Sequence, residues 1–93
     1  MKAKLITYSI TKQPIPIQNQ LRKQLNGHND TSHQGKYTYH RKGLLNTITH
    51  IKPSKGTIIA PTKEAEQIIA LLKNNQAEIK TYDIQINKSA FKQ

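Results

Sequence analysis

The chain of 93 residues contains no cysteine and no tryptophan, and its aromatic residues are one phenylalanine and four tyrosines. The absence of cysteine excludes disulfide bonds, thiolate zinc sites and thiol nucleophiles. Hydrophobic residues make up 34% of the chain, below the roughly 45–50% that is typical of globular domains. No stretch approaches the roughly 20 apolar residues that a membrane-spanning helix needs, and the N-terminus lacks the apolar run of a signal peptide. These absences predict a small cytoplasmic domain with one modest core and no membrane segment.

Acidic residues are scarce and unevenly placed. Residues 1–60 hold ten Lys and Arg side chains, all four His and a single carboxylate, Asp30, which leaves a net charge of +9 on that segment. Residues 61–93 hold five Lys and four acidic residues, a net charge of +1. Such a field of cations attracts polyanions, because counterions released from the polymer drive association. The charge predicts nucleic acid as the class of partner and names no reaction.

The apolar pattern predicts one domain over residues 1–87 and a polar tail over 88–93. We expect strands over residues 3–10, 35–41, 57–60 and 79–86, and a polar loop over 28–34. One helix is expected to begin near Pro16 and to end at Asn26-Gly27. A second is expected to begin at Thr62, which can cap it, and to end at Asn74-Asn75. Residues 44–51 fit a short helix and an irregular strand equally well.

The order strand, helix, strand, strand, helix, strand favours an α+β fold of the ferredoxin-like type, a split βαββαβ sandwich. In that arrangement four antiparallel strands form one sheet, and both helices cover one of its faces. The sheet would leave edge strands through which a homodimer could pair.

The densest group of candidate binding residues lies over residues 35–43, a basic and aromatic strand that ends in a cationic turn. Cations can neutralise phosphates, and a tyrosine ring offers a flat face on which an unpaired base stacks for about 1–3 kcal/mol. Further cations on the first helix and around Pro53 extend the expected surface over residues 22–55. The candidate nucleic-acid-binding residues are Arg22, Lys23, Lys36, Tyr37, Tyr39, His40, Arg41, Lys42, Lys52 and Lys55.

Tyr37 and Tyr39 admit two interpretations. Strand alternation places both on one face, and as the only apolar side chains of that strand they are expected to face the core, with Lys36 and His40 outward. The alternative is that both rings face solvent and stack on bases. The segment Gly-Lys-Tyr-Thr-Tyr, residues 35–39, resembles the signature of the RNA-recognition motif, which places aromatic residues two apart on a sheet. That resemblance implies the second interpretation.

The four histidines raise the question of a metal site. The spacings between His28, His33, His40 and His50 are five, seven and ten residues, which fit no usual zinc pattern, and only Asp30 is near them as a carboxylate. A metal-dependent nuclease of ferredoxin-like fold would place an acidic residue at the end of the first strand, where the sequence has none. We therefore expect no metal and no cofactor.

Metal-independent RNA cleavage is an alternative function. It needs a base, an acid and a cation at the phosphate, roles that are open to His33, His40 and Arg41 or Lys42. Thr31-Ser32-His33, which precedes a basic strand, resembles the Gly-Ser-His segment of the HicA-type messenger-RNA interferase toxins, and this resemblance implies a ribonuclease.

Taken together, the sequence predicts a small, basic, cytoplasmic protein that binds RNA or another nucleic acid. The preferred interpretation is a non-enzymatic component of a ribonucleoprotein particle such as the ribosome, because the charge is high and the groupings of acid and base residues are weak. Two alternatives stay open. One is a metal-independent ribonuclease of the toxin type, with His33 and His40 as catalytic candidates, and the other is an interaction module that binds an acidic protein.

Overall fold

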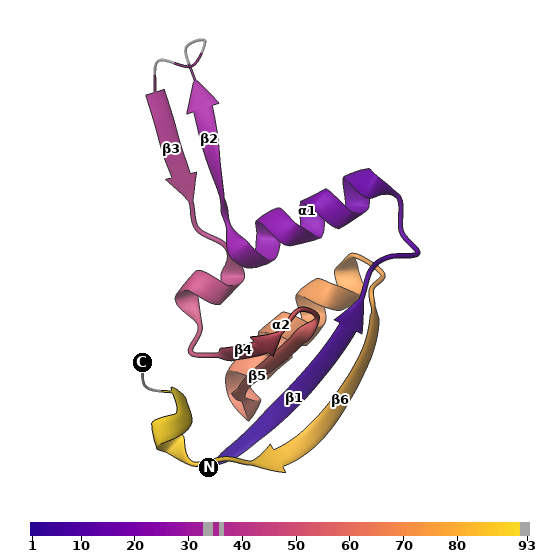
Figure 1. Cartoon of the computed structure of the whole chain (residues 1–93), viewed down its shortest axis with the longest axis vertical. Helices are drawn as coiled ribbons and strands as arrows, with labels where there is room; N and C mark the ends of the chain where they lie inside the picture. The colour runs from indigo at the N-terminus through magenta and orange to yellow at the C-terminus, as the bar shows by residue number, and fades with distance from the viewer. Residues whose placement is uncertain (33–34, 36, 92–93) are drawn as a thin grey trace.

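The computed structural model describes residues 1–32, 35 and 37–91, which form two helices, two 3-10 turns and six strands (Figure 1). In chain order the elements are β1 (Lys2–Ser9), α1 (Ile15–Asn26), β2 (His28–Ser32), β3 (Tyr37–Arg41), η1 (Leu44–Thr47), β4 (Ile51–Ser54), β5 (Thr57–Pro61), α2 (Thr62–Asn74), β6 (Glu78–Gln85) and η2 (Lys88–Phe91).

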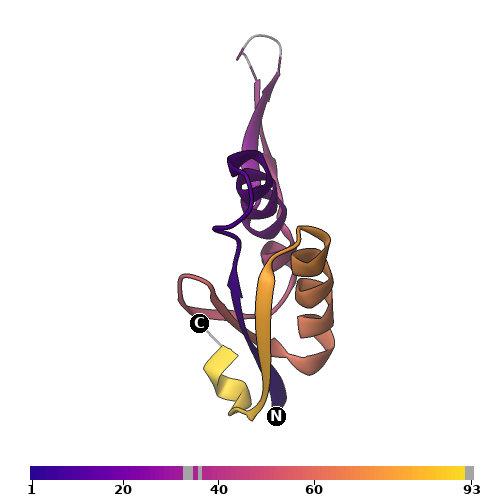
Figure 2. The same cartoon turned by 90° about the vertical axis from the view of Figure 1, so that its right-hand side faces the viewer.

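Four strands form one antiparallel sheet in the order β4-β5-β1-β6. One face of this sheet packs against α2, and the core lies between them. Ile6 of β1 and Ile58 of β5 stand opposite each other in the register, and both are fully buried together with Ile68 and Leu72 of α2. In Figure 2 the β6 edge of the sheet faces the viewer, with α2 on one side of β6 and η2 on the other. The body is therefore a sheet with one well-covered face.

The second helix of the body, α1, is amphipathic and has its main packing contacts with η1 and α2. Its buried side chains Leu21 and Leu25 enter the same core as Leu45 of η1 and Ile48. Four-residue spacing places Leu21 and Leu25 on one side of the helix, which explains why that side is buried. Within the described residues, neither helix is long and apolar enough to cross a membrane.

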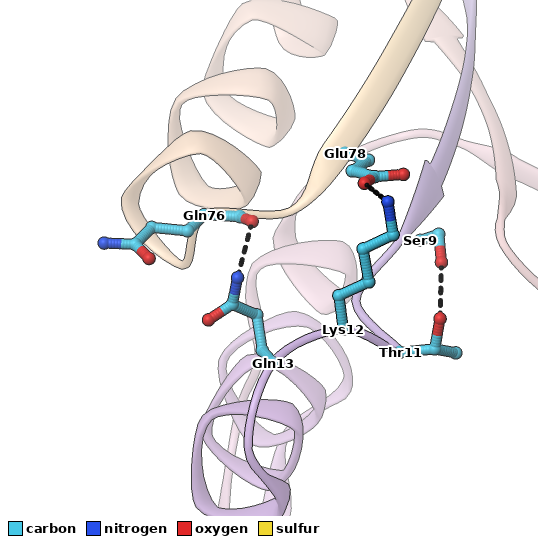
Figure 3. A network of polar contacts seen from close by, with 6 residues as sticks. All are labelled: Ser9, Thr11, Lys12, Gln13, Gln76 and Glu78. Atoms are coloured by element: carbon cyan, nitrogen blue, oxygen red, sulfur yellow. Dashed lines mark hydrogen bonds and ion pairs between the residues drawn. The ribbon is translucent and has the colours of Figure 1, made fainter.

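Two polar connections tie α1 to the rest of the body. The segment before α1 meets the start of β6, where Lys12 Nζ lies 2.7 Å from Glu78 Oε1 and Gln13 donates to the Gln76 carbonyl at 3.4 Å (Figure 3). Ser9 and Thr11 also share a hydrogen bond of 3.2 Å there (Figure 3). The hydrogen bond with Glu78 raises the pKa of Lys12.

Asn75 makes the second connection, between the end of α2 and α1. The residue is 4% exposed, and its Nδ2 donates to Gln24 Oε1 at 2.8 Å and to the Leu71 carbonyl at 3.0 Å. Its Oδ1 accepts a hydrogen bond of 3.2 Å from Gln20. Because buried polar groups are costly unless paired, this side chain holds the two helices in one relative position.

Most of the expected elements are confirmed. The strands over residues 3–10, 57–60 and 79–86 correspond to β1, β5 and β6, and both helices are present. Thr62 does not cap the second helix as expected, because it is the first residue of α2 and Pro61 stands at the cap position. The stretch over 44–51, which fitted two descriptions, divides into the 3-10 turn η1 and the start of β4. Pro53 lies in β4, which is at one edge of the sheet, the position where a strand tolerates a residue without an amide hydrogen.

Two parts of the expected topology were wrong. Residues 37–41 do form a strand, but β3 pairs with β2, in the segment that was expected to be a loop, and these two strands make a separate sheet. The position that this strand was expected to occupy is taken by β4, whose Ile51 stands opposite Ile59 of β5. The alternation of side chains in residues 35–41 predicts a strand and a common face for its tyrosines, but it does not say with which strand this one pairs. In addition, β2 and β3 contain no aliphatic side chain that would favour their burial in the core.

The β2–β3 hairpin, hereafter the arm, extends away from the body at the end of α1 (Figures 1 and 2). Its projection accounts for the elongated form of the molecule, whose principal extents are 48 × 31 × 20 Å. Gly35 lies at the tip with a φ of 89°, in the left-handed region that glycine enters without strain. The sequence therefore builds a compact body and a separate two-stranded ribbon.

Candidate nucleic-acid interface

The register of the arm sorts its side chains onto two faces. Tyr39 stands opposite Asp30 and Arg41 opposite His28, and side chains of opposed residues in an antiparallel pair share a face. Tyr37, Tyr39 and Arg41 therefore lie on one face, because residues two apart in a strand point to the same side. The other face carries Thr38 and His40 with Thr31 and Asn29.

Both tyrosines of the arm are exposed, Tyr37 to 55% and Tyr39 to 51%. The expectation that they face the core was wrong, and the alternative of solvent-facing rings holds. The physical reason is the location of the strand. Because β3 pairs with β2 away from the four-stranded sheet, neither of its faces meets a helix, and every residue of β3 is exposed.

Arg41 is engaged within the arm. Its Nε donates to Asp30 Oδ2 at 3.1 Å, and the Asp30 Oδ1 accepts the backbone N–H of Thr31 at the same distance. The hydrogen bond from Arg41 lowers the pKa of Asp30, and the positive charge of the guanidinium acts in the same direction. The carboxylate is thus ionised near neutral pH, and it neutralises one of the cations of the arm.

His40 lies on the opposite face from Arg41, where its Nδ1 is 3.1 Å from Asn29 Oδ1. Tyr39, His40, Arg41 and Lys42 line an open hollow along the second strand of the arm. These four successive residues carry an aromatic ring, an imidazole and two cations, which alternation distributes over both faces of the ribbon. Those groups can stack on a base and contact a phosphate, the two kinds of contact that single-stranded nucleic acid offers.

Two glycines form the base of the arm, where its strands leave the body. A Cβ atom on Gly27 would overlap with the Arg41 carbonyl oxygen, and one on Gly43 would overlap with the backbone of Gly27 and Leu25. The Gly43 N–H donates to Asn46 Oδ1 at 2.7 Å. The two backbones cross here with no room for a side chain, so the position of the arm depends on this contact.

The structure places the other candidate cations at two locations. Arg22 and Lys23 are exposed in the last turns of α1, which leads directly into β2, and Arg22 bonds to Asn19 Oδ1 at 3.4 Å. Lys52 and Lys55 are exposed on β4 and on the turn before β5, in the body (Figure 1). The surface expected over residues 22–55 therefore divides into a region around the arm and a sheet edge.

Two of the candidate residues, His33 and Lys36, lie outside the described residues. Of the described histidines, His50 has its Nδ1 2.8 Å from the Ile48 carbonyl oxygen, and the buried Nδ1 of His28 has no hydrogen-bond partner in the described part of the chain. Over the same residues, no three His, Asp or Glu side chains gather in a way that could hold a metal ion.

Two structural features of the arm were missed in the sequence analysis. The first is the pairing of His28–Ser32 with β3, and its signal was the Gly at position 35 near the middle of a polar segment, a common hairpin pattern. The second is the role of Asp30 as the partner of Arg41, which follows only from the register.

Comparison of the chain with protein-family models, with curated proteins and with solved structures finds no significant match.

Proposed function

We propose that the protein is a small RNA-binding protein whose arm makes the principal contact, and that it acts as a non-enzymatic component of a ribonucleoprotein particle such as the ribosome. One observation carries the proposal. Tyr37, Tyr39 and Arg41 share an exposed face of a ribbon that contributes no described residue to the hydrophobic core. Since the body is built without this ribbon, a role for the arm is best sought in contact with a partner.

The chemistry of the arm fits a single-stranded or looped nucleic acid. Tyrosine rings stack on unpaired bases of any identity, and Lys42 with the cations at the end of α1 can follow the phosphate chain. A lone two-stranded ribbon is only marginally stable in water. A bound strand would stabilise it by mass action, because the ligand binds the ordered form.

We also infer that the body is a variant of the ferredoxin-like sandwich, in which the arm and η1 are inserted between α1 and the second strand of the sheet. The order β4-β5-β1-β6, antiparallel throughout, supports this inference. It is the order of a split βαββαβ fold once β4 is counted as the second strand. We further propose that the protein acts in the cytoplasm, a compartment that suits a basic chain built without disulfide bonds.

A binding titration tests the proposed function. Purified protein is mixed with labelled single-stranded RNA, structured RNA and duplex DNA at two salt concentrations, and product gels are run on the same samples. Tyr37→Ala and Tyr39→Ala are each expected to weaken RNA binding by about 5- to 150-fold, which corresponds to the loss of one stacked base. The matched variants Tyr37→Phe and Tyr39→Phe keep the ring and are expected to bind as the wild type does.

The same samples decide against the alternatives. RNA that stays intact in the bound samples supports the binding role. Cleavage without added metal that disappears in His40→Ala or His33→Ala would replace the proposal with a ribonuclease. If no nucleic acid binds at low salt, both proposals fail and an acidic protein becomes the partner to seek.

A further inference from the structure

The two edges of the four-stranded sheet differ in their capacity to pair with another strand. β4, at one edge, has four residues, includes Pro53 and is irregular in register between Ile51 and Ser54. β6, at the other edge, has eight residues, contains no proline and pairs with β1 without interruption. No described strand pairs with its outer side. An uninterrupted edge strand of this length is a template for pairing with a further strand.

The hydrogen-bond pattern tells which residues of β6 face outward. In an antiparallel pair, opposed residues alternate between those that exchange both backbone hydrogen bonds and those that exchange none. Met1 and Ile86 exchange both, at 3.0 and 3.1 Å, next to the opposed residues Lys2 and Gln85. Residues 84, 82 and 80 therefore bond to β1. The backbone groups that point away from the sheet belong to Ile79, Thr81, Asp83 and Gln85.

The charge of the molecule also favours contact at this edge. The chain carries a net charge of +10, which opposes the approach of two copies at most orientations. On β6, however, two carboxylates are paired with cations. Asp83 lies 2.8 Å from Lys4 Nζ, and Glu78 lies 2.7 Å from Lys12 Nζ. The strand itself contains one cation, Lys80, so little positive charge opposes a second copy there. The ion pair lowers the pKa of Asp83, because Lys4 donates a hydrogen bond to it.

An apolar row ends at the same edge. On the sheet face opposite α2, the register aligns Ile51, Ile59, Leu5 and Tyr82 across all four strands. Tyr82 is the last member of the row, and it is 53% exposed. A second tyrosine placed opposite it would continue the row and form an aromatic cross-strand pair, a favourable contact in antiparallel sheets.

We propose that β6 is the interface of a homodimer, in which it pairs antiparallel with β6 of a second copy and Tyr82 lies on the two-fold axis. In this register all four outward residues find partners. Ile79 stands opposite Gln85 of the partner subunit, and Thr81 stands opposite Asp83 of the partner subunit. A register centred on Thr81 pairs only three outward residues from each copy. A register centred on Lys80 places the two Lys80 side chains, one from each copy, opposite each other. The two sheets then form one continuous sheet.

Engineered cysteines test the register. The chain has no cysteine of its own, so each variant carries a single thiol. In the Tyr82→Cys variant the two thiols meet at the axis, at a separation that a disulfide spans. In the matched variant Lys80→Cys they are about 13 Å apart along the strands, which is too far. Under mild oxidation Tyr82→Cys is expected to form a covalent dimer at least about tenfold faster than Lys80→Cys. Equal rates would overturn the proposed register.

Analytical sedimentation of proteins that carry no engineered cysteine tests whether the dimer forms. The buffer contains moderate salt, which screens the net charge of the chain. The wild type is expected to sediment as a dimer at high concentration. Thr81→Pro is expected to remain a monomer with unchanged circular dichroism, because it removes an N–H that points outward and leaves the pairing with β1 in place. Thr81→Val keeps that N–H and should still form the dimer. A wild type that stays monomeric up to about 200 μM would overturn the proposal. No nucleic acid is present in either assay, so the result is independent of the proposed function.

Discussion

Asp30 is the only acidic residue among residues 1–60, and it forms an ion pair with Arg41 within the arm. Its carboxylate connects β2 to β3 through Arg41, and it also accepts the N–H of Thr31. The residue therefore has two opposed effects. It orders the ribbon, and it occupies a guanidinium that would otherwise be available to a phosphate. A bound phosphate would compete with Asp30 for Arg41.

The substitution Asp30→Asn separates these effects. It removes one negative charge and releases Arg41, so we expect RNA to bind about 2- to 10-fold more tightly at moderate salt, with a slope of log K against log salt that is steeper by about 0.7. The measurement is a titration at several salt concentrations. Asp83→Asn, which removes a carboxylate of the body, is the matched control and should leave affinity unchanged. Weaker binding in Asp30→Asn would mean that order in the arm matters more than the free cation.

Low pH should act on the same pair. The pKa of Asp30 in the folded protein lies below its usual value. The ion pair therefore stabilises the arm fully at a pH above the usual pKa of an aspartate, and this stabilisation is lost only as the pH falls through the lowered pKa of the folded protein. The arm is therefore expected to keep its order at mildly acidic pH.

At the scale of elements, the sequence identifies the parts of the body better than it identifies the arm. β1, β5, β6 and both helices follow from apolar spacing, because each of them places apolar side chains in the core or, for Ile79 of β6, against it. The arm buries no such side. Its strands are made of polar residues and exposed tyrosines, so periodicity could indicate β3 but could not say that β2 is its partner. The exposure of Tyr37 and Tyr39 follows from that pairing and was missed for the same reason.

The link between α1 and α2 has a predictable effect on stability. Asn75→Ala removes a buried side chain together with its hydrogen bonds to Gln20, Gln24 and the Leu71 carbonyl. We expect a loss of about 1–3 kcal/mol in the free energy of unfolding, measured by chemical denaturation. Gln20→Ala, at an exposed position of the same network, should cost less than about 1 kcal/mol. If both variants lost the same free energy of unfolding, Asn75 would not be the residue that chiefly stabilises the contact between α1 and α2.

At the scale of the whole molecule, the described candidate nucleic-acid-binding cations fall into two groups, one around the arm and one at the edge formed by β4 and its turn. A nucleic acid that follows the arm would contact the first group and leave Lys52 and Lys55 outside the contact. A titration can distinguish these groups, because each phosphate contact adds a fixed increment to the salt dependence.

We therefore expect the slope of log K against log salt for single-stranded RNA to lie between about −2 and −4, and Lys42→Gln to make it shallower by about 0.7. Lys73→Gln, an exposed position near the end of α2, removes the same charge from the body and should leave the slope unchanged. Equal changes in both variants would indicate that the net charge, and no particular surface, determines binding.

The complete exposure of β3 has a consequence for the history of the chain. Residues of the body are constrained by packing, since almost any change at Ile6 or Leu72 disturbs the core. The residues of β3 are all exposed and carry no such constraint from the core, whereas Gly27 and Gly43 at the base of the arm have no room for a side chain. Mutation can alter the length and the composition of the arm while the body continues to fold. Selection for a new target can therefore act on the arm without passing through unstable intermediates, and related chains would be expected to diverge fastest there.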